Sequence, residues 1–271
     1  MCIRDRDIAN LSYGNLEIDG GGVKSLTSAT TINNTLTLTS GNLSIGDYDL
    51  TLYNPVFGSF DGSHMIVTGG TGYLIKQGTI ANASMEYPVG TGAKYTPVTL
   101  AGTAGATSGR IFIRAVEGTS PNMVPGSESL AKYWDILTPD YTLNSGDVTF
   151  TWHGTEALGD PANFSLVQWT GGPAWEKRAA VSGTNSLTHA LSNTIAGEWT
   201  TTERAVLYSY NTGDWHTAST WTTDPSGTEL VGSRVPQDDD RVIILNGYTA
   251  VSYTHLRAHE TVLDLVCRLL L

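Results

Sequence analysis

Short apolar pairs recur at a spacing of seven residues, and this repeat restricts the fold more than any other feature. Each pair holds two apolar residues separated by one other residue, which places both apolar side chains on one face of a short strand. The evenly spaced pairs are Leu36–Leu38, Leu43–Ile45 and Leu50–Leu52, and similar pairs occur at Leu16–Ile18, Met65–Val67 and Tyr73–Ile75. The pattern therefore predicts a series of short strands over residues 7–85.

The residues between the pairs favour tight turns. Ser40–Asn42 and Gly46–Asp49 are rich in Gly, Asn and Asp, which tolerate left-handed backbone conformations. A spacing of seven also occurs in coiled coils, but the Gly and Thr content opposes a helix. Stacked coils of a β-helix, each burying the face of its neighbour, fit the pattern, and a flat β-meander is the competing interpretation.

Longer strands follow over residues 86–203. Turn clusters at 170–173 and 181–185 separate some of them, and this spacing predicts an antiparallel β-sandwich. We expect Trp134 and Trp152 in its core because both lie on strands. The expected strands are Thr96–Leu100, Arg110–Val116, Tyr133–Leu137, Asp147–Trp152, Ser165–Trp169 and Ser186–Leu191. The fold class is therefore all-β, with a β-helix-like region followed by a sandwich.

A third pattern occupies residues 204–249, and we interpret it as the truncated start of a further β module. Both ends of the chain match translated sequencing adapter. Residues 1–6 correspond to the end sequence of a transposase-based library, and residues 250–271 to its reverse complement with the following adapter. Such segments are set aside before the fold is considered. The helical character of residues 250–271 is then an artefact. We expect the residues between the adapter segments to be a metagenomic fragment of a larger protein.

Composition excludes several classes of function. Both cysteines, Cys2 and Cys267, lie in the adapter segments, which leaves no disulfide framework and no cysteine zinc site. The formal net charge of −11 opposes binding to nucleic acid or to an anionic membrane. No apolar stretch approaches the roughly 20 residues that cross a bilayer, so membrane insertion is not expected.

Several segments resemble modules of large cell-surface proteins of gliding bacteria and their relatives, which are exported by a C-terminal sorting signal. The resemblance is carried by Leu36–Gly46, by Tyr87–Gly90 with Tyr95–Val98, and by Tyr133–Ile136. It implies a repetitive, adhesin-like protein at an extracellular or cell-surface location. Residues 204–249 resemble the opening of a glycine-rich extracellular β-helix domain of some hyaluronan-degrading and surface proteins, through Trp215, Trp221, Pro236, Asp240, Val242–Ile244 and Gly247.

Four tryptophans are candidate sugar contacts, because an exposed indole in or beside a turn can stack on a pyranose ring. They are Trp169, Trp175, Trp215 and Trp221. The alternative is that they fill the core or seal a module junction, since Trp is usually well buried. An extracellular glycan or another cell-surface component is the expected partner.

Calcium is the one cofactor that the sequence suggests. Asp238, Asp239 and Asp240 offer hard oxygen ligands beside turn carbonyls, and Asp47 with Asp49 offers a second set. Neither set matches an EF-hand loop or the nonapeptide calcium repeat. The alternative is that these carboxylates are solvated turn residues.

No catalytic residue is predicted. His153 lies near Glu156 and Asp160, and such a group can act as acid and base, but a polar loop at the sandwich rim is the favoured explanation. The leading hypothesis is a non-catalytic structural or adhesive module of a large secreted or cell-surface bacterial protein. The alternative is a carbohydrate-binding accessory region of a polysaccharide-degrading enzyme. A polysaccharide lyase is a third hypothesis, disfavoured because basic residues such as Lys24 and Lys76 are sparse in the coils.

Overall fold

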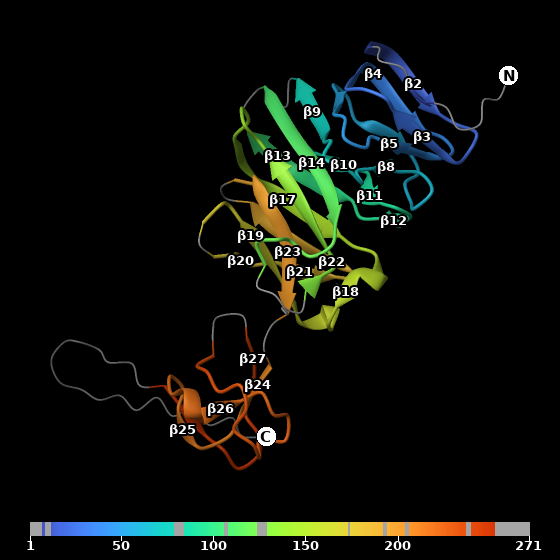
Figure 1. Cartoon of the computed structure of the whole chain (residues 1–271). Coiled ribbons are helices and arrows are strands. Elements are labelled where there is room, and N and C mark those ends of the chain that lie inside the picture. The colour runs from blue at the N-terminus through green and yellow to red at the C-terminus, as the bar shows by residue number, and fades with distance from the viewer. Residues whose placement is uncertain are drawn as a thin grey trace. The chain divides into compact units, whose positions relative to one another are not determined.

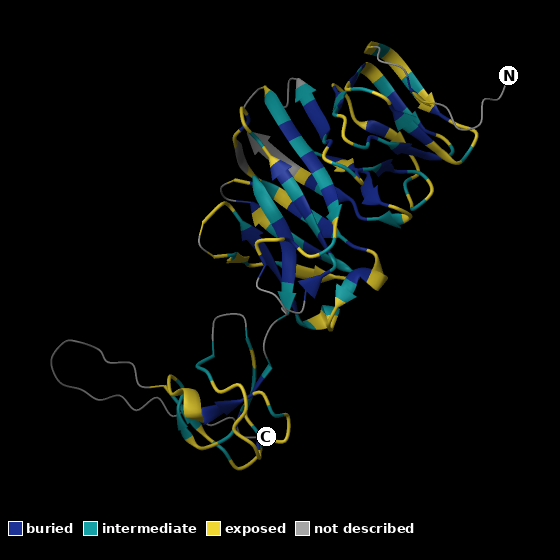
Figure 2. Ribbon diagram, in the orientation of Figure 1, coloured by how far each residue is buried: buried dark blue, intermediate teal, exposed yellow. Residues whose placement is uncertain are grey.

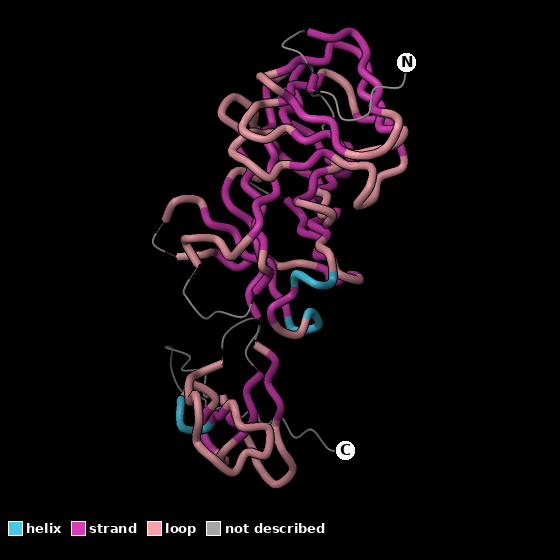
Figure 3. Tube along the Cα trace, turned by 45° about the vertical axis from the view of Figure 1, so that its right-hand side comes forward, coloured by secondary structure: helices cyan, strands magenta, loops and turns pink. Residues whose placement is uncertain are grey.

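The computed structural model describes residues 7–8, 12–78, 84–105, 108–123, 129–172, 174–191, 194–203, 206–236 and 240–252 (Figure 1). These residues form strands and loops with three short 3-10 turns, Gly154–Glu156, Pro161–Asn163 and Ala218–Thr220, which confirms the all-β class (Figure 3). The chain divides after Glu203 into two compact units. The terminal segments 1–6 and 253–271, predicted to be adapter, lie outside the described residues.

A β-solenoid of about four turns occupies residues 7–90. Its coils stack through parallel pairing: Thr30 lies beside Leu50, and Leu50 beside Leu74, so successive coils take 20 and then 24 residues. One sheet of the solenoid contains β1 (Asp7–Ile8), β3 (Val23–Leu26), β5 (Asn42–Ser44), β8 (Ile66–Val67), β11 (Val89–Thr91) and β12 (Lys94–Tyr95). The parallel register confirms the β-helix and excludes the meander, whose neighbouring strands are antiparallel.

The opposite side of the solenoid begins a larger sheet of twelve strands. Its solenoid strands are β2 (Ser12–Ile18), β4 (Thr30–Leu38), β6 (Leu50–Leu52), β7 (Val56–Gly58) and β9 (Leu74–Gly78). Consecutive apolar pairs alternate between the two sheets, so the seven-residue spacing measures the distance across a coil rather than from coil to coil. The paired residues from Leu36 to Leu52 are at most 2% exposed and form the solenoid core.

The same sheet continues into the sandwich without a break. β9 pairs in parallel with β6 and antiparallel with β14 (Gly109–Glu117), through partners such as Leu74 and Ile113. The remaining strands are β15 (Ser129–Leu130), β16 (Lys132–Leu137), β18 (Ala157–Leu158), β19 (Phe164–Trp169), β20 (Glu176–Arg178) and β23 (Gly197–Glu203). The boundary predicted after residue 85 therefore falls inside one compact unit.

A second, antiparallel sheet packs against this one and completes the sandwich. It contains β10 (Met85–Tyr87), β13 (Val98–Gly105), β17 (Leu143–Thr151), β21 (Val181–Gly183) and β22 (Ser186–Leu191). Phe150 lies between Trp134 and Trp199 of the facing sheet, with both ring-centroid distances at 5.0 Å. Trp134 is 0% and Trp152 3% exposed, which confirms both as core residues. Along the sandwich strands, buried residues alternate with more exposed ones (Figure 2).

The second unit is a small β module. β24 (Val206–Ser209) pairs antiparallel with β26 (Trp221–Thr222) and parallel with β27 (Arg241–Ile243). β25 (Gly213–Asp214) pairs in parallel with β28 (Ala250–Val251), so two residues assigned to adapter from the sequence take part in a strand. Trp221, which is 0% exposed, packs edge to face against Trp215 with ring centroids 4.9 Å apart.

Candidate binding groove

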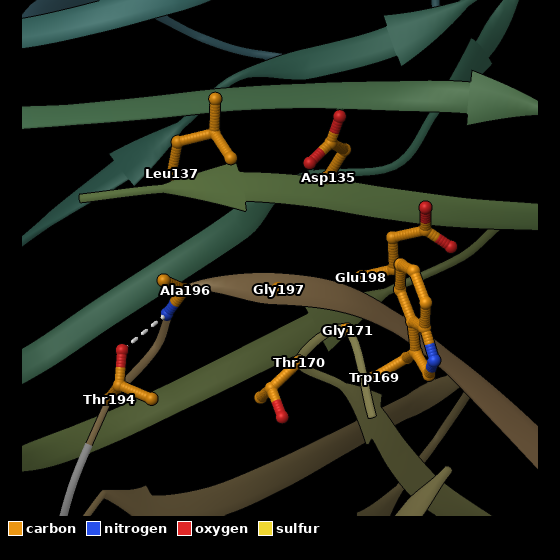
Figure 4. Close-up of a pocket in the computed structure, with 9 residues that line it drawn as sticks. All are labelled: Asp135, Leu137, Trp169, Thr170, Gly171, Thr194, Ala196, Gly197 and Glu198. Atoms are coloured by element: carbon orange, nitrogen blue, oxygen red, sulfur yellow. Dashed lines mark hydrogen bonds between the residues drawn. The ribbon is translucent and has the colours of Figure 1, made fainter. Parts of the chain in front are cut away.

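A groove of about 440 Å³ lies on the outer face of the large sheet, over β16, β23 and the end of β19 (Figure 4). Leu137 and Trp169 supply its apolar sides, and Asp135 and Glu198 supply its charged groups. Turn residues beside the strands, among them Gly171, Thr194 and Ala196, complete the lining. Its lining is mostly apolar, as in sites that bind small molecules.

Strand register brings the functional groups of the groove into one row. Asp135 lies directly opposite Glu198 on β23, and Glu198 lies directly opposite Trp169 on β19. Side chains at directly opposite positions have Cβ atoms about 5 Å apart on the same face of a sheet. The indole of Trp169 stands beside the Glu198 side chain (Figure 4).

Neighbouring side chains hold Asp135 in place. Its Oδ2 atom accepts hydrogen bonds from the Tyr73 hydroxyl at 2.5 Å and from Nε and Nη2 of Arg114 at 3.1 and 2.8 Å. The Arg114 guanidinium also lies 4.6 Å from the centre of the Tyr73 ring, a cation–π contact. Burial and then the bond to Asp135 raise the pKa of Tyr73 well above its ordinary value, so its hydroxyl stays a donor.

Glu198 is oriented by the segment between β14 and β15. The Ser120 hydroxyl donates to Oε2 at 2.5 Å, and Nδ2 of Asn122 donates to Oε1 at 3.1 Å. Trp175 donates its Nε1 hydrogen to the backbone oxygen of Asn122 at 2.9 Å. The ring of Trp169 is fixed by the bond from its Nε1 to the Gly172 carbonyl, also 2.9 Å long.

The four predicted tryptophans therefore have different surroundings. Trp169 is half-buried and lines the groove. Trp175, also half-buried, bonds to the segment that holds Glu198. Trp215 is half-buried in the second unit, where Trp221 is 0% exposed and donates its Nε1 hydrogen to the Trp215 carbonyl. The structure corrects the assignment of Trp221, which presents no indole face to a sugar.

Those predicted calcium ligands that the structure describes bind other residues of the protein through their carboxylates. The Asp240 side chain is 0% exposed and pairs with Nη2 of Arg234 at 2.6 Å, so a cationic side chain already balances its charge. Asp238 and Asp239 lie outside the described residues. Over the part of the chain that is described, no group of three or more His, Cys, Asp or Glu residues could hold a metal.

The second predicted calcium set connects neighbouring coils instead. Oδ1 of Asp47 accepts from the backbone nitrogen and the hydroxyl of Thr71 at 2.9 and 3.1 Å. Oδ1 of Asp49 accepts from the Tyr73 backbone nitrogen at 2.9 Å. The bonds from Thr71 hold the pKa of Asp47 below its ordinary value, so its carboxylate stays charged as an acceptor.

His153 caps the start of the 3-10 turn Gly154–Glu156, and Glu156 is its last residue. Nδ1 of His153 accepts from the Thr155 backbone nitrogen, and Oε2 of Glu156 accepts from the His153 backbone nitrogen at 3.0 Å. Glu156 is 0% exposed, and its Oε1 lies 3.1 Å from Nζ of Lys132, which is also 0% exposed. The carboxylate is therefore part of a buried ion pair that the sequence did not predict.

Comparisons with protein-family models, curated proteins and solved structures find no match to this chain. Among the described residues, no helix has the length and apolar character needed to cross a membrane. The groove geometry and the fold therefore provide the basis for assigning a function.

Proposed function

We propose that this chain is a non-catalytic structural module of a large secreted or cell-surface protein, in which residues 7–203 form a stiff support. The observation that carries the proposal is the continuous sheet, which runs from the solenoid strand β2 to the sandwich strands β16 and β23. A module that displays a binding surface away from a cell must resist bending. A single hydrogen-bonded sheet provides that resistance better than a flexible linker between separate domains.

The contacts at the junction support this role. Five residue pairs join β9 to β14, from Gly78 opposite Gly109 to Leu74 opposite Ile113. On the inner face, Thr68 of the solenoid donates its hydroxyl to the Ala115 carbonyl at 2.8 Å and accepts from the Ala115 nitrogen at 3.0 Å. Thr68 is 1% exposed, so these bonds are shielded from water. Bending at the junction would break several of them together.

Double electron–electron resonance on the full chain tests the stiffness directly. Spin labels are attached through Phe57→Cys in the solenoid and Val181→Cys in the sandwich, which are 52% and 74% exposed, with Cys2 and Cys267 changed to Ser. A control pair, Leu158→Cys with Val181→Cys, lies within the sandwich. It reports how broad a distance distribution the motion of the labels alone produces.

We expect one distance distribution across the junction, as narrow as that of the control pair. A broad or two-peaked distribution across the junction, with a narrow control, would show a hinge and would overturn the proposal.

A further inference from the structure

Apolar surface is concentrated beside charge in the groove over β16, β19 and β23. Leu137 is 42% exposed, and the Trp169 indole, which lines the same groove, is half-buried. A large apolar side chain left in water loses the stabilisation that burial would give. The groove therefore combines two apolar side chains, Leu137 and Trp169, with two carboxylates that can accept hydrogen bonds.

The positions of the two carboxylates lower the stability of the sheet. Asp135 and Glu198 are directly opposite each other, and like charges in that position are destabilising. Arg114 offsets the charge of Asp135, whereas Glu198 is bound only by neutral donors among the described residues. The arrangement therefore suits a ligand that donates hydrogen bonds.

Acceptor capacity remains on both groups. The three bonds to Asp135 all reach Oδ2, so Oδ1 accepts no bond from the described residues. Each oxygen of Glu198 accepts one bond, and a carboxylate oxygen has about two lone-pair sites. Free acceptors thus lie about one and two strand spacings, or roughly 5 and 10 Å, from the Trp169 position.

We propose that this groove binds a hexopyranose unit of a neutral polysaccharide. The C–H face of the ring packs on the indole of Trp169, whose π-face carries partial negative charge. Hydroxyls of the sugar donate to Glu198 and to Oδ1 of Asp135. The volume of about 440 Å³ lies within the roughly 300–1,000 Å³ usual for small-molecule sites.

A glycine leaves room for the sugar at the remaining side. A Cβ atom added at Gly171, which lines the groove, would meet no neighbouring atom within 4 Å. The carboxylates and the net charge of −11 repel uronic acids, so the preference is for uncharged sugars. This binding role is independent of the stiffness of the module.

Affinity gel electrophoresis of the full chain tests the proposal. The probes are soluble laminarin, xyloglucan, galactomannan and dextran as neutral polymers, polygalacturonate as an anionic polymer and chitosan as a cationic one. We expect retardation by at least one neutral polymer and none by polygalacturonate. Trp169→Ala should weaken binding to the retarding polymer by roughly thirtyfold, because truncating a central aromatic anchor removes much of the contact energy.

Two further variants separate binding from folding. Leu137→Arg alters an exposed residue and fills the groove, and Glu198→Gln keeps the shape but removes the charged acceptor; both should weaken binding roughly tenfold or more. Phe57→Ala is the matched control, since it removes an exposed aromatic from the solenoid and should leave binding unchanged. Far-ultraviolet circular dichroism confirms that each variant is folded.

Failure to bind any neutral polymer, binding to chitosan alone, or binding by folded Trp169→Ala and Leu137→Arg variants with unchanged affinity would each overturn the proposal. Release of reducing ends from a bound polymer would instead contradict the non-catalytic function, while leaving the sugar site in place.

Discussion

The buried ion pair between Lys132 and Glu156 offers the sharpest test of the packing in the sandwich. Nζ of Lys132 lies 3.1 Å from Oε1 of Glu156 and 2.9 Å from Oγ1 of Thr91, and both charged side chains are 0% exposed. Burial lowers the pKa of Lys132, although the neighbouring Glu156 acts to raise it. The perturbation is Lys132→Met, which keeps an unbranched side chain of similar length and removes its charge.

The size of the effect follows from the complete burial of both groups. Without Lys132, the Glu156 carboxylate keeps the bond from the His153 nitrogen but loses its only ionic partner among the described residues. Removing one partner of a buried pair costs about 3–5 kcal/mol. Lys132→Met with Glu156→Gln leaves no buried charge, so it should recover most of that loss.

Urea unfolding followed by near-ultraviolet circular dichroism measures these free energies. A loss below about 1 kcal/mol for Lys132→Met, or a double variant less stable than the single one, would refute the reasoning.

Three further predictions concern turns. Asp49→Ala removes the bond to the Tyr73 nitrogen and should lower the free energy of unfolding by about 1 kcal/mol in urea; no change would contradict the coil-to-coil role. Gly41→Ala should cost more than about 1 kcal/mol, seen as a lower melting temperature, because φ is +103° and a Cβ would lie 2.6 Å from the Gly22 carbonyl. Bonds from the Ser226 hydroxyl and then from backbone nitrogens lower the pKa of Asp224 from 3.8, so the second unit should lose stability as pH falls below that value. Tryptophan emission that stays constant down to about pH 2 would contradict the last prediction.

The fold followed from the sequence wherever a local pattern determines it. Period-two pairs such as Leu43–Ile45, separated by Gly and Asp turns, predicted the solenoid, and their side chains are its core. The length of a coil did not follow, because the same spacing fits strands on one sheet or on two opposite sheets. Only the long-range register, such as Thr30 beside Leu50, distinguishes these arrangements.

The candidate site was only partly accessible from the sequence. Trp169 stood out because it precedes a Gly-rich turn. Asp135 and Glu198 gave no signal, since their alignment depends on the pairing of two strands far apart in the chain. Lys132 resembles the many lysines that are solvated, and its burial depends on Glu156 arriving from a separate turn. Sequence spacing carries no information on such contacts.

Hydrogen–deuterium exchange with mass spectrometry tests most directly whether the solenoid and the sandwich form one unit. The account predicts that the amides of β9 and β14 exchange as slowly as those of β17, a central strand of the facing sheet. The reason is that β9 and β14 are hydrogen-bonded neighbours within one continuous sheet. If peptides covering residues 74–78 and 109–113 exchange much faster than β17, while β4 and β17 both remain protected, the two parts open separately. That result would contradict the account.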